Sequence, residues 1–141
     1  MAGSSMTFAF DDAVHGGRIR KLTCTFLTDD ADGTASGTTV LPVNGELIKI
    51  VTDPGSAAPS ANWDVVLTDD NGLNPLAGIQ NAAALLARHT TNTEQTYLQL
   101  LNADITPIGI AAFPLVTGLL TIAVANGGNS KTGTIAIYIR G

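Results

Sequence analysis

The chain has 141 residues, a net charge of −5, 45% hydrophobic residues and only 13% charged residues. This length is typical of one domain with one core, so residues 1–141 are expected to form a single domain. The seven Lys and Arg residues are scattered along an acidic chain, which excludes a basic face able to bind nucleic acid. Low surface charge favours association with other protein chains or a homo-oligomer, a dimer or trimer, over a weakly charged monomer.

Two sequence features bear on whether the protein is secreted or inserted into a membrane. Residues 1–6 lack the basic region and the apolar run of a secretory signal, so synthesis and initial retention in the cytoplasm are expected. The stretch from Ile108 to Ala125 is uncharged over 18 residues, the lower limit for a membrane span. Pro114 and Gly118 interrupt it, which favours two strands joined by a turn, and no membrane partner is expected.

Apolar residues at every second position predict half-buried β-strands along most of the chain. The clearest segments are Lys21–Leu27, Glu46–Thr52, Trp63–Thr68, Leu120–Val124 and Ile135–Ile139. Weaker candidates are Thr7–Phe10, Thr38–Val43, Thr96–Leu101 and Ile108–Phe113. Within Glu46–Thr52, the alternation places Ile48 and Ile50 on one face and Leu47, Lys49 and Val51 on the other.

The turn Asn126–Ser130 contains two glycines and two asparagines, which adopt the positive φ angles of tight turns without penalty. It predicts a β-hairpin between the last two strands. About eight short strands separated by turns predict an all-β fold, an antiparallel β-sandwich of jelly-roll-like type. One short helical or irregular excursion is expected near residues 75–88, either reaching a neighbouring chain or covering an open end of the sandwich.

No residue pattern predicts catalysis, a metal site or a bound cofactor. The acidic turns at Asp29–Asp32 and Asp69–Asp70 lack the glutamate of a calcium loop and are interpreted as ordinary turn residues. His15 and His89 have no metal-ligand spacing, and the lone Cys24 is interpreted as a buried hydrophobe. We therefore expect a protein that is not an enzyme.

The candidate interface residues lie near the chain ends and on outward strand faces. Trp63 shares a face with Val65 and Leu67, which favours the core, whereas Tyr138 lies opposite the isoleucine stripe and favours a contact. Residues 1–12 are interpreted as a possible extended N-terminal arm, free to add to a neighbour's sheet edge. The predicted interface set is Phe8, Phe10, Arg18, Arg20, Tyr138 and Arg140.

Two stretches resemble a known group of proteins. Gly45–Gly55 followed by Asn62–Asp69 has a strand-turn-strand pattern, and Leu120–Ile135 has a strand, a glycine turn and a final strand. Both resemble small structural proteins of tailed-bacteriophage virions, which include the capsid decoration, or cement, proteins. The resemblance covers roughly the middle and last thirds of the chain, and neither the first third nor the Ala-rich segment Leu76–Arg88 carries a match.

The resemblance implies a decoration protein that binds and stabilises the lattice of the major capsid protein. Its location would be the capsid surface of the virion, after synthesis in the host cytoplasm. The alternative is a carbohydrate- or receptor-binding β-sandwich module of a phage tail or fibre, for which exposed aromatic residues would be the distinguishing feature.

Overall fold

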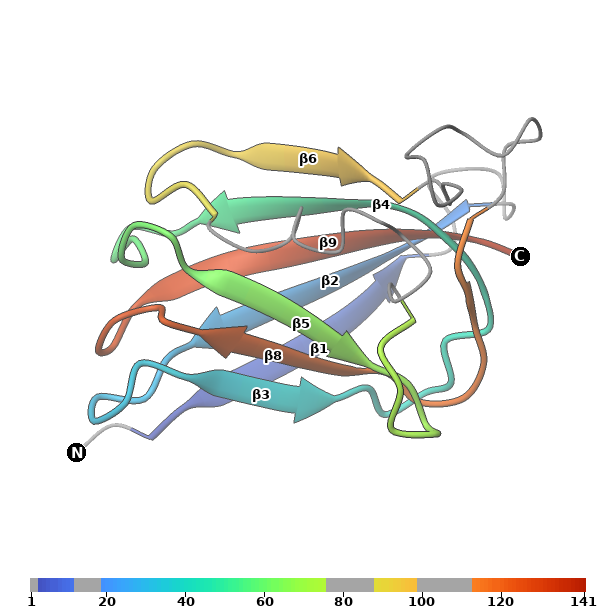
Figure 1. The fold of residues 1–141 in the computed structure, drawn as a ribbon, viewed down its shortest axis with the longest axis horizontal. Coiled ribbons are helices and arrows are strands. Elements are labelled where there is room, and N and C mark those ends of the chain that lie inside the picture. The colour runs from blue at the N-terminus through green and yellow to red at the C-terminus, as the bar shows by residue number, and fades with distance from the viewer. Residues whose placement is uncertain (1–2, 12–18, 76–87, 99–112) are drawn as a thin grey trace, which may run out of the picture.

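The structure is a computed structural model that describes residues 3–11, 19–75, 88–98 and 113–141. In these residues the protein is all-β and contains no helix. Two antiparallel sheets pack face to face (Figure 1). The predicted antiparallel β-sandwich is confirmed.

The larger sheet has the strand order β1-β2-β9-β4-β6, and the short β7 also pairs with β4. Its strands are β1 (Ser5–Asp11), β2 (Ile19–Leu27), β4 (Gly45–Pro54), β6 (Glu94–Tyr97), β7 (Leu115–Val116) and β9 (Thr132–Arg140). The smaller sheet has the order β3-β8-β5. Its strands are β3 (Ala35–Thr38), β5 (Asp64–Thr68) and β8 (Thr121–Ala125).

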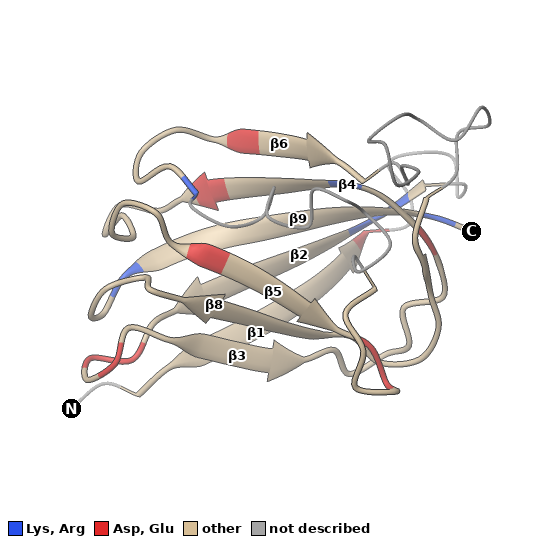
Figure 2. Ribbon diagram, in the orientation of Figure 1, with Lys and Arg blue, Asp and Glu red and all other residues tan. Residues whose placement is uncertain are grey.

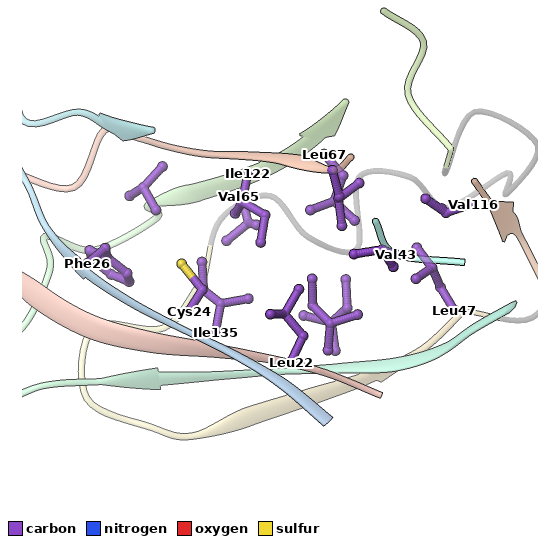
Figure 3. Packing of buried hydrophobic residues seen from close by; sticks show 14 of the residues in the cluster. Leu22, Cys24, Phe26, Val43, Leu47, Val65, Leu67, Val116, Ile122 and Ile135 are labelled. Carbon is purple, nitrogen blue, oxygen red and sulfur yellow. The ribbon is translucent and has the colours of Figure 1, made fainter. Parts of the chain in front are cut away.

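The core lies between the two sheets (Figure 3). Alternate residues of β2, β5, β8 and β9 point into it, as the sequence periodicity predicted. The fully enclosed side chains include Leu22, Cys24, Phe26, Trp63, Leu67, Leu120, Ile122, Ile135, Ile137 and Ile139. The Trp63 ring packs against Phe26 with 5.4 Å between ring centroids, and its Nε1–H donates to the His89 carbonyl at 3.0 Å. The prediction that Trp63 belongs to the core is therefore confirmed.

Strand β4 departs from simple alternation through a β-bulge at Ile48. Leu47 pairs with Ile139 and Lys49 pairs with Tyr138, so Ile48 is an extra residue in the ladder. A bulge shifts every following side chain to the opposite face. Leu47 and Ile50 are consequently both buried, whereas Ile48 is only partly buried, so the prediction that Ile48 and Ile50 share a face opposite Leu47 is wrong.

The turn before β9 is not a hairpin, and that prediction is also wrong. β8 pairs with β3 and β5 in the smaller sheet, and β9 pairs with β2 and β4 in the larger sheet. The turn therefore crosses the end of the sandwich (Figure 1). Its residues do adopt the expected positive φ angles, at Asn126, Gly128 and Ser130.

This crossing turn is held by hydrogen bonds to loops from other parts of the chain. Gly127 N donates to the Gly33 carbonyl at 3.0 Å, and Ser60 N donates to the Gly127 carbonyl at 2.9 Å. Thr28 Oγ1 donates to the Gly128 carbonyl at 2.6 Å. Backbone groups that a hairpin would have paired within itself are thus satisfied by neighbouring loops.

Some predicted boundaries shift. The strand expected at Thr38–Val43 is wrong except at its first residue, because β3 covers Ala35–Thr38 and residues 39–44 form a loop. Most of the excursion near 75–88 and of the segment Ile108–Phe113 lies outside the described residues, as do 99–101 of the strand expected at Thr96–Leu101. Consecutive strands from β2 to β6, and then β8 and β9, alternate between the sheets, which a jelly-roll requires. The jelly-roll assignment itself stays a prediction.

Candidate interaction surfaces

Strand β1 belongs to the sheet and does not extend freely from it. Seven consecutive residues of β1 pair with β2, from Ser5 with Leu27 to Asp11 with Lys21. Phe8 and Phe10 pack partly against the core. The interpretation of residues 1–12 as an extended arm therefore does not hold for Ser5–Asp11, which form an edge strand of the larger sheet. Deleting residues 1–12 would remove an edge strand and uncover the core beneath it.

Two predicted interface arginines hold loops at the end of the sandwich where β1 and β9 finish. Arg20 Nη2 donates to the Asn44 carbonyl at 2.6 Å. Arg140 pairs with the Glu46 carboxylate at 3.1 Å, and its guanidinium lies 5.5 Å from the centre of the Phe113 ring. The exposed ion pair contributes little to stability. Arg18 lies outside the described residues.

At this end three loops meet, and we refer to residues 39–44, 69–75 and 114–120 together as the loop end. Val43 N donates to the Gly118 carbonyl at 2.7 Å, and Gly118 N donates to Asn44 Oδ1 at 3.0 Å. The Asp70 carboxylate lies directly over Gly118. The loop end lies at the right of Figure 1.

The loop end is the most apolar exposed region that the structure describes. Val40 is 84% exposed, Leu41 61%, Leu73 64% and Leu115 67%. Residues 39–44 follow β3, residues 69–75 follow β5, and Leu115 lies in the short β7 before β8. Clustered exposed hydrophobic side chains mark interaction sites on soluble proteins.

A small hollow lies next to the loop end. It has a volume of about 90 Å³ and is lined by Phe10, Arg20, Leu41 and Pro42. The Nε of Arg20, one of these lining residues, is buried with no hydrogen-bond partner in the part of the chain that the structure describes.

The outer face of the smaller sheet is flat and nearly uncharged. Strands β3 and β8 contain no charged residue, and β5 contains only Asp64 (Figure 2). Thr38 and Thr121 share a hydrogen bond between hydroxyls at 2.8 Å, and Val66 is 39% exposed. This face is therefore formed mostly by small uncharged residues and carries fewer large apolar side chains than the loop end.

Tyr138 lies on the outer face of the larger sheet, as predicted. It pairs with Lys21 on one side and Lys49 on the other, and Lys49 also pairs with Tyr97. The Lys49 ammonium lies 4.7 Å from the centre of the Tyr138 ring and 5.6 Å from that of Tyr97. Such contacts are cation–π interactions, which stabilise by about 0.5–1 kcal/mol at exposed sites.

The acidic turns bond their own backbone, as the turn interpretation predicted. Asp29 Oδ1 accepts from Ala31 N, and Asp69 Oδ1 accepts from Asn71 N and Leu73 N. The Thr34 hydroxyl and then its backbone N–H hold the pKa of the Asp32 carboxyl below its usual value.

The environments of His89 and Cys24 are those of residues that support the fold. His89 Nδ1 accepts from the backbone of Thr91 and Asn92, and burial raises the pKa of the Cys24 thiol to about 12. Within the described ranges, no three His, Cys, Asp or Glu residues gather where they could hold a metal ion. No helix suited to crossing a membrane occurs in those ranges. His15 lies outside them.

With these surfaces described, the chain was compared with known proteins. No family model and no curated protein matches it.

Sequence patterns did not identify the loop end or Tyr97. Leu41 precedes Pro42 and Leu115 follows Pro114, at points where a strand is interrupted while the chain remains apolar. An apolar residue next to a turn signal, outside any alternating run, is the signal that could have identified them. Tyr97 joins Tyr138 only through the pairing of β6 with β4, a contact between distant segments.

Proposed function

We propose that this protein is a structural binding module of a tailed-phage virion, a capsid decoration protein that attaches to the major capsid protein on the head surface. The observation that carries the proposal is the exposed apolar loop end. The protein acts by burying this end against capsid subunits and has no catalytic role.

The apolar side chains at the loop end can supply the necessary binding energy. Fully burying one Leu or Val side chain contributes about 1.5–3 kcal/mol, so Val40, Leu41 and Leu115 together could outweigh much of the cost of association.

Attachment would stabilise the head through linkage. A protein that binds assembled subunits more tightly than free ones adds its binding free energy to the assembled state. Self-association as a dimer or trimer would multiply this effect, because linked copies bind a repeating lattice with high avidity. We also propose a jelly-roll connectivity, which occurs in viral capsid and lectin domains, and which adds support only by analogy of fold.

The proposal is tested by mixing the purified protein with undecorated heads of its phage and sedimenting the particles. The wild-type protein should sediment with the heads, and Leu41→Glu should weaken attachment at least tenfold because it places a charge in the contact. Val66→Glu is the matched control, since Val66 is exposed on the smaller sheet and outside the loop end.

Equal attachment of Leu41→Glu and wild type would refute the role of the loop end. Loss of attachment in Val66→Glu alone would indicate that the smaller sheet, and not the loop end, contacts the capsid. No attachment of the wild-type protein would refute the decoration function. Thermal denaturation of both variants confirms that each is folded.

A second function, carbohydrate binding, is favoured by one observation. The larger sheet presents two tyrosines on its outer face, and Tyr97 is 61% exposed. Exposed aromatic rings pack well against the apolar faces of sugars.

A further inference from the structure

A row of alternating basic and aromatic residues crosses the larger sheet. The row runs from Lys21 on β2 through Tyr138 on β9 and Lys49 on β4 to Tyr97 on β6. Neighbouring strands lie about 4.8 Å apart, so backbone positions two strands apart along the row, such as those of Lys21 and Lys49, are separated by roughly 10 Å. Figure 2 shows the basic positions of β2, β4 and β9 close together at the end of the sheet where the C-terminus lies.

The row borders a groove of about 280 Å³, lined by Ile19, Ile48, Lys49, Tyr97 and Tyr138. The bulge in β4 makes this groove possible, because it places the partly buried Ile48 beside Lys49 and not in the core. The volume is close to the lower limit for small-ligand sites. The groove therefore combines apolar and aromatic walls with one ammonium group.

The charge of the groove differs from that of the whole chain, which is −5. Lys49 has the two tyrosine rings as its neighbours and makes no ion pair within 4.0 Å in the described part of the chain. Lys21 pairs across strands with Asp11 on β1, which reduces the positive potential at that end of the row. Arg140, two residues beyond Tyr138 on β9, is paired with Glu46. Lys49 is thus the cation best placed to meet an anionic ligand.

The position of the groove selects among anionic ligands. Its floor lies over β4 and β9, whose backbones are paired on both sides, so an extended peptide could add main-chain hydrogen bonds only beside the groove, along the edge strand β6. Two lysines on an acidic chain neutralise too few phosphates to hold a nucleic acid. An acidic sugar needs neither main-chain hydrogen bonds nor several cations. Its ring can pack its apolar face on a tyrosine while its acidic group pairs with the Lys49 ammonium.

The geometry points to the Tyr97–Tyr138 groove as a binding site for an acidic saccharide, which packs on the two tyrosines and pairs its carboxylate or sulfate with Lys49. Lys21 provides a second cation roughly 10 Å along the row for a chain carrying repeated acidic groups. This site is separate from the loop end and does not depend on attachment to a capsid.

The test is calorimetric titration of the full chain with oligogalacturonate and with chondroitin sulfate oligosaccharides. Fully methyl-esterified oligogalacturonate is the neutral control of the same length and linkage. At least one acidic saccharide should bind, the methyl ester should bind at least tenfold more weakly, and added salt should weaken binding. Lys49→Gln and Tyr97→Ala should each weaken binding about tenfold or more, because each removes one of the two main contacts.

Lys131→Gln is the matched control, because it makes the same change of charge in the turn before β9, at the other end of that strand from Tyr138. This variant and Leu41→Glu should bind the saccharide as the wild type does, and Leu41→Glu also separates this site from particle attachment. The inference is overturned if neither acidic saccharide binds, if the methyl ester binds equally well, or if polyglutamate binds as tightly. It is also overturned if Lys131→Gln weakens binding as much as Lys49→Gln.

Discussion

The crossing of the chain from β8 to β9 depends on a close approach between two glycine turns. Gly33 has a φ of +71°, and a Cβ added to it would lie 2.8 Å from the backbone N of Gly128. Gly72 occupies a similar acidic turn with a φ of +76°, and a Cβ added there would meet nothing within 4 Å. The two glycines therefore differ in surroundings while sharing a backbone conformation.

Replacing each glycine with alanine separates these effects. The left-handed conformation costs a non-glycine residue about 1–2 kcal/mol, and this term is common to both variants. Forcing a methyl group against backbone atoms adds about 1–3 kcal/mol, and this term applies to Gly33→Ala alone. We predict that Gly33→Ala lowers the free energy of unfolding by about 1–3 kcal/mol more than Gly72→Ala, on the basis of that difference.

Urea denaturation followed by circular dichroism measures the difference. For a domain of this size it corresponds to midpoints separated by about 1 M urea, given a slope of about 1–3 kcal/mol per M. Equal losses in the two variants would refute the close approach. They would instead agree with the hairpin that the sequence suggested, in which β8 and β9 pair directly.

Three further predictions concern the core and the bulge. Because burial raises the pKa of Cys24 from its ordinary 9.0 to about 12, the unfolded thiol ionises first. The protonated thiol therefore stabilises the folded protein fully below pH 9, and this stabilisation should be lost between pH 9 and pH 12 at up to about 1.4 kcal/mol per pH unit. When the free energy of unfolding is measured against pH, its decline over this range must be smaller in Cys24→Ala. Trp63→Ala should destabilise by about 3–5 kcal/mol in chemical denaturation, and a loss below about 1 kcal/mol would contradict its enclosed position. Deleting Ile48 should leave a folded protein whose free energy of unfolding falls by about 1–2 kcal/mol, because the hydrogen bond from Leu98 N to the Ile48 carbonyl is lost. Deleting Val51 should prevent folding, because the side chains at one end of β4 would then point to the wrong face of the sheet. Similar circular dichroism spectra for both deletions would contradict the bulge.

The strands could be predicted from local sequence because successive side chains of a strand point to opposite faces, so core-facing apolar residues recur at every second position. The alternation of Leu22, Cys24 and Phe26 is written in consecutive residues, and so is that of Ile135, Ile137 and Ile139. The partner of each strand is not local. A turn such as Asn126–Ser130 has the same residues whether it joins two strands of one sheet or carries the chain to the opposite sheet.

The surfaces were predicted less completely than the core for the same reason. Tyr138 was identified from its own strand, but its neighbour Tyr97 becomes visible only once β6 pairs with β4. The bulge at Ile48 depends on how β4 fits β9, and nothing in the neighbouring residues marks it. Phe8 and Phe10 were predicted as contacts within an extended arm, because the pairing of their strand with β2 cannot be seen in their own segment.

Hydrogen exchange, compared between the free protein and the protein bound to undecorated heads, tests the proposed docking most directly. If capsid subunits cover the loop end, amides in residues 39–44 and 114–120 should exchange more slowly on the particle, while those of the turn Asn126–Ser130 at the opposite end should be unchanged. Unaltered exchange in those two loops on occupied heads, with slowing elsewhere, would contradict it.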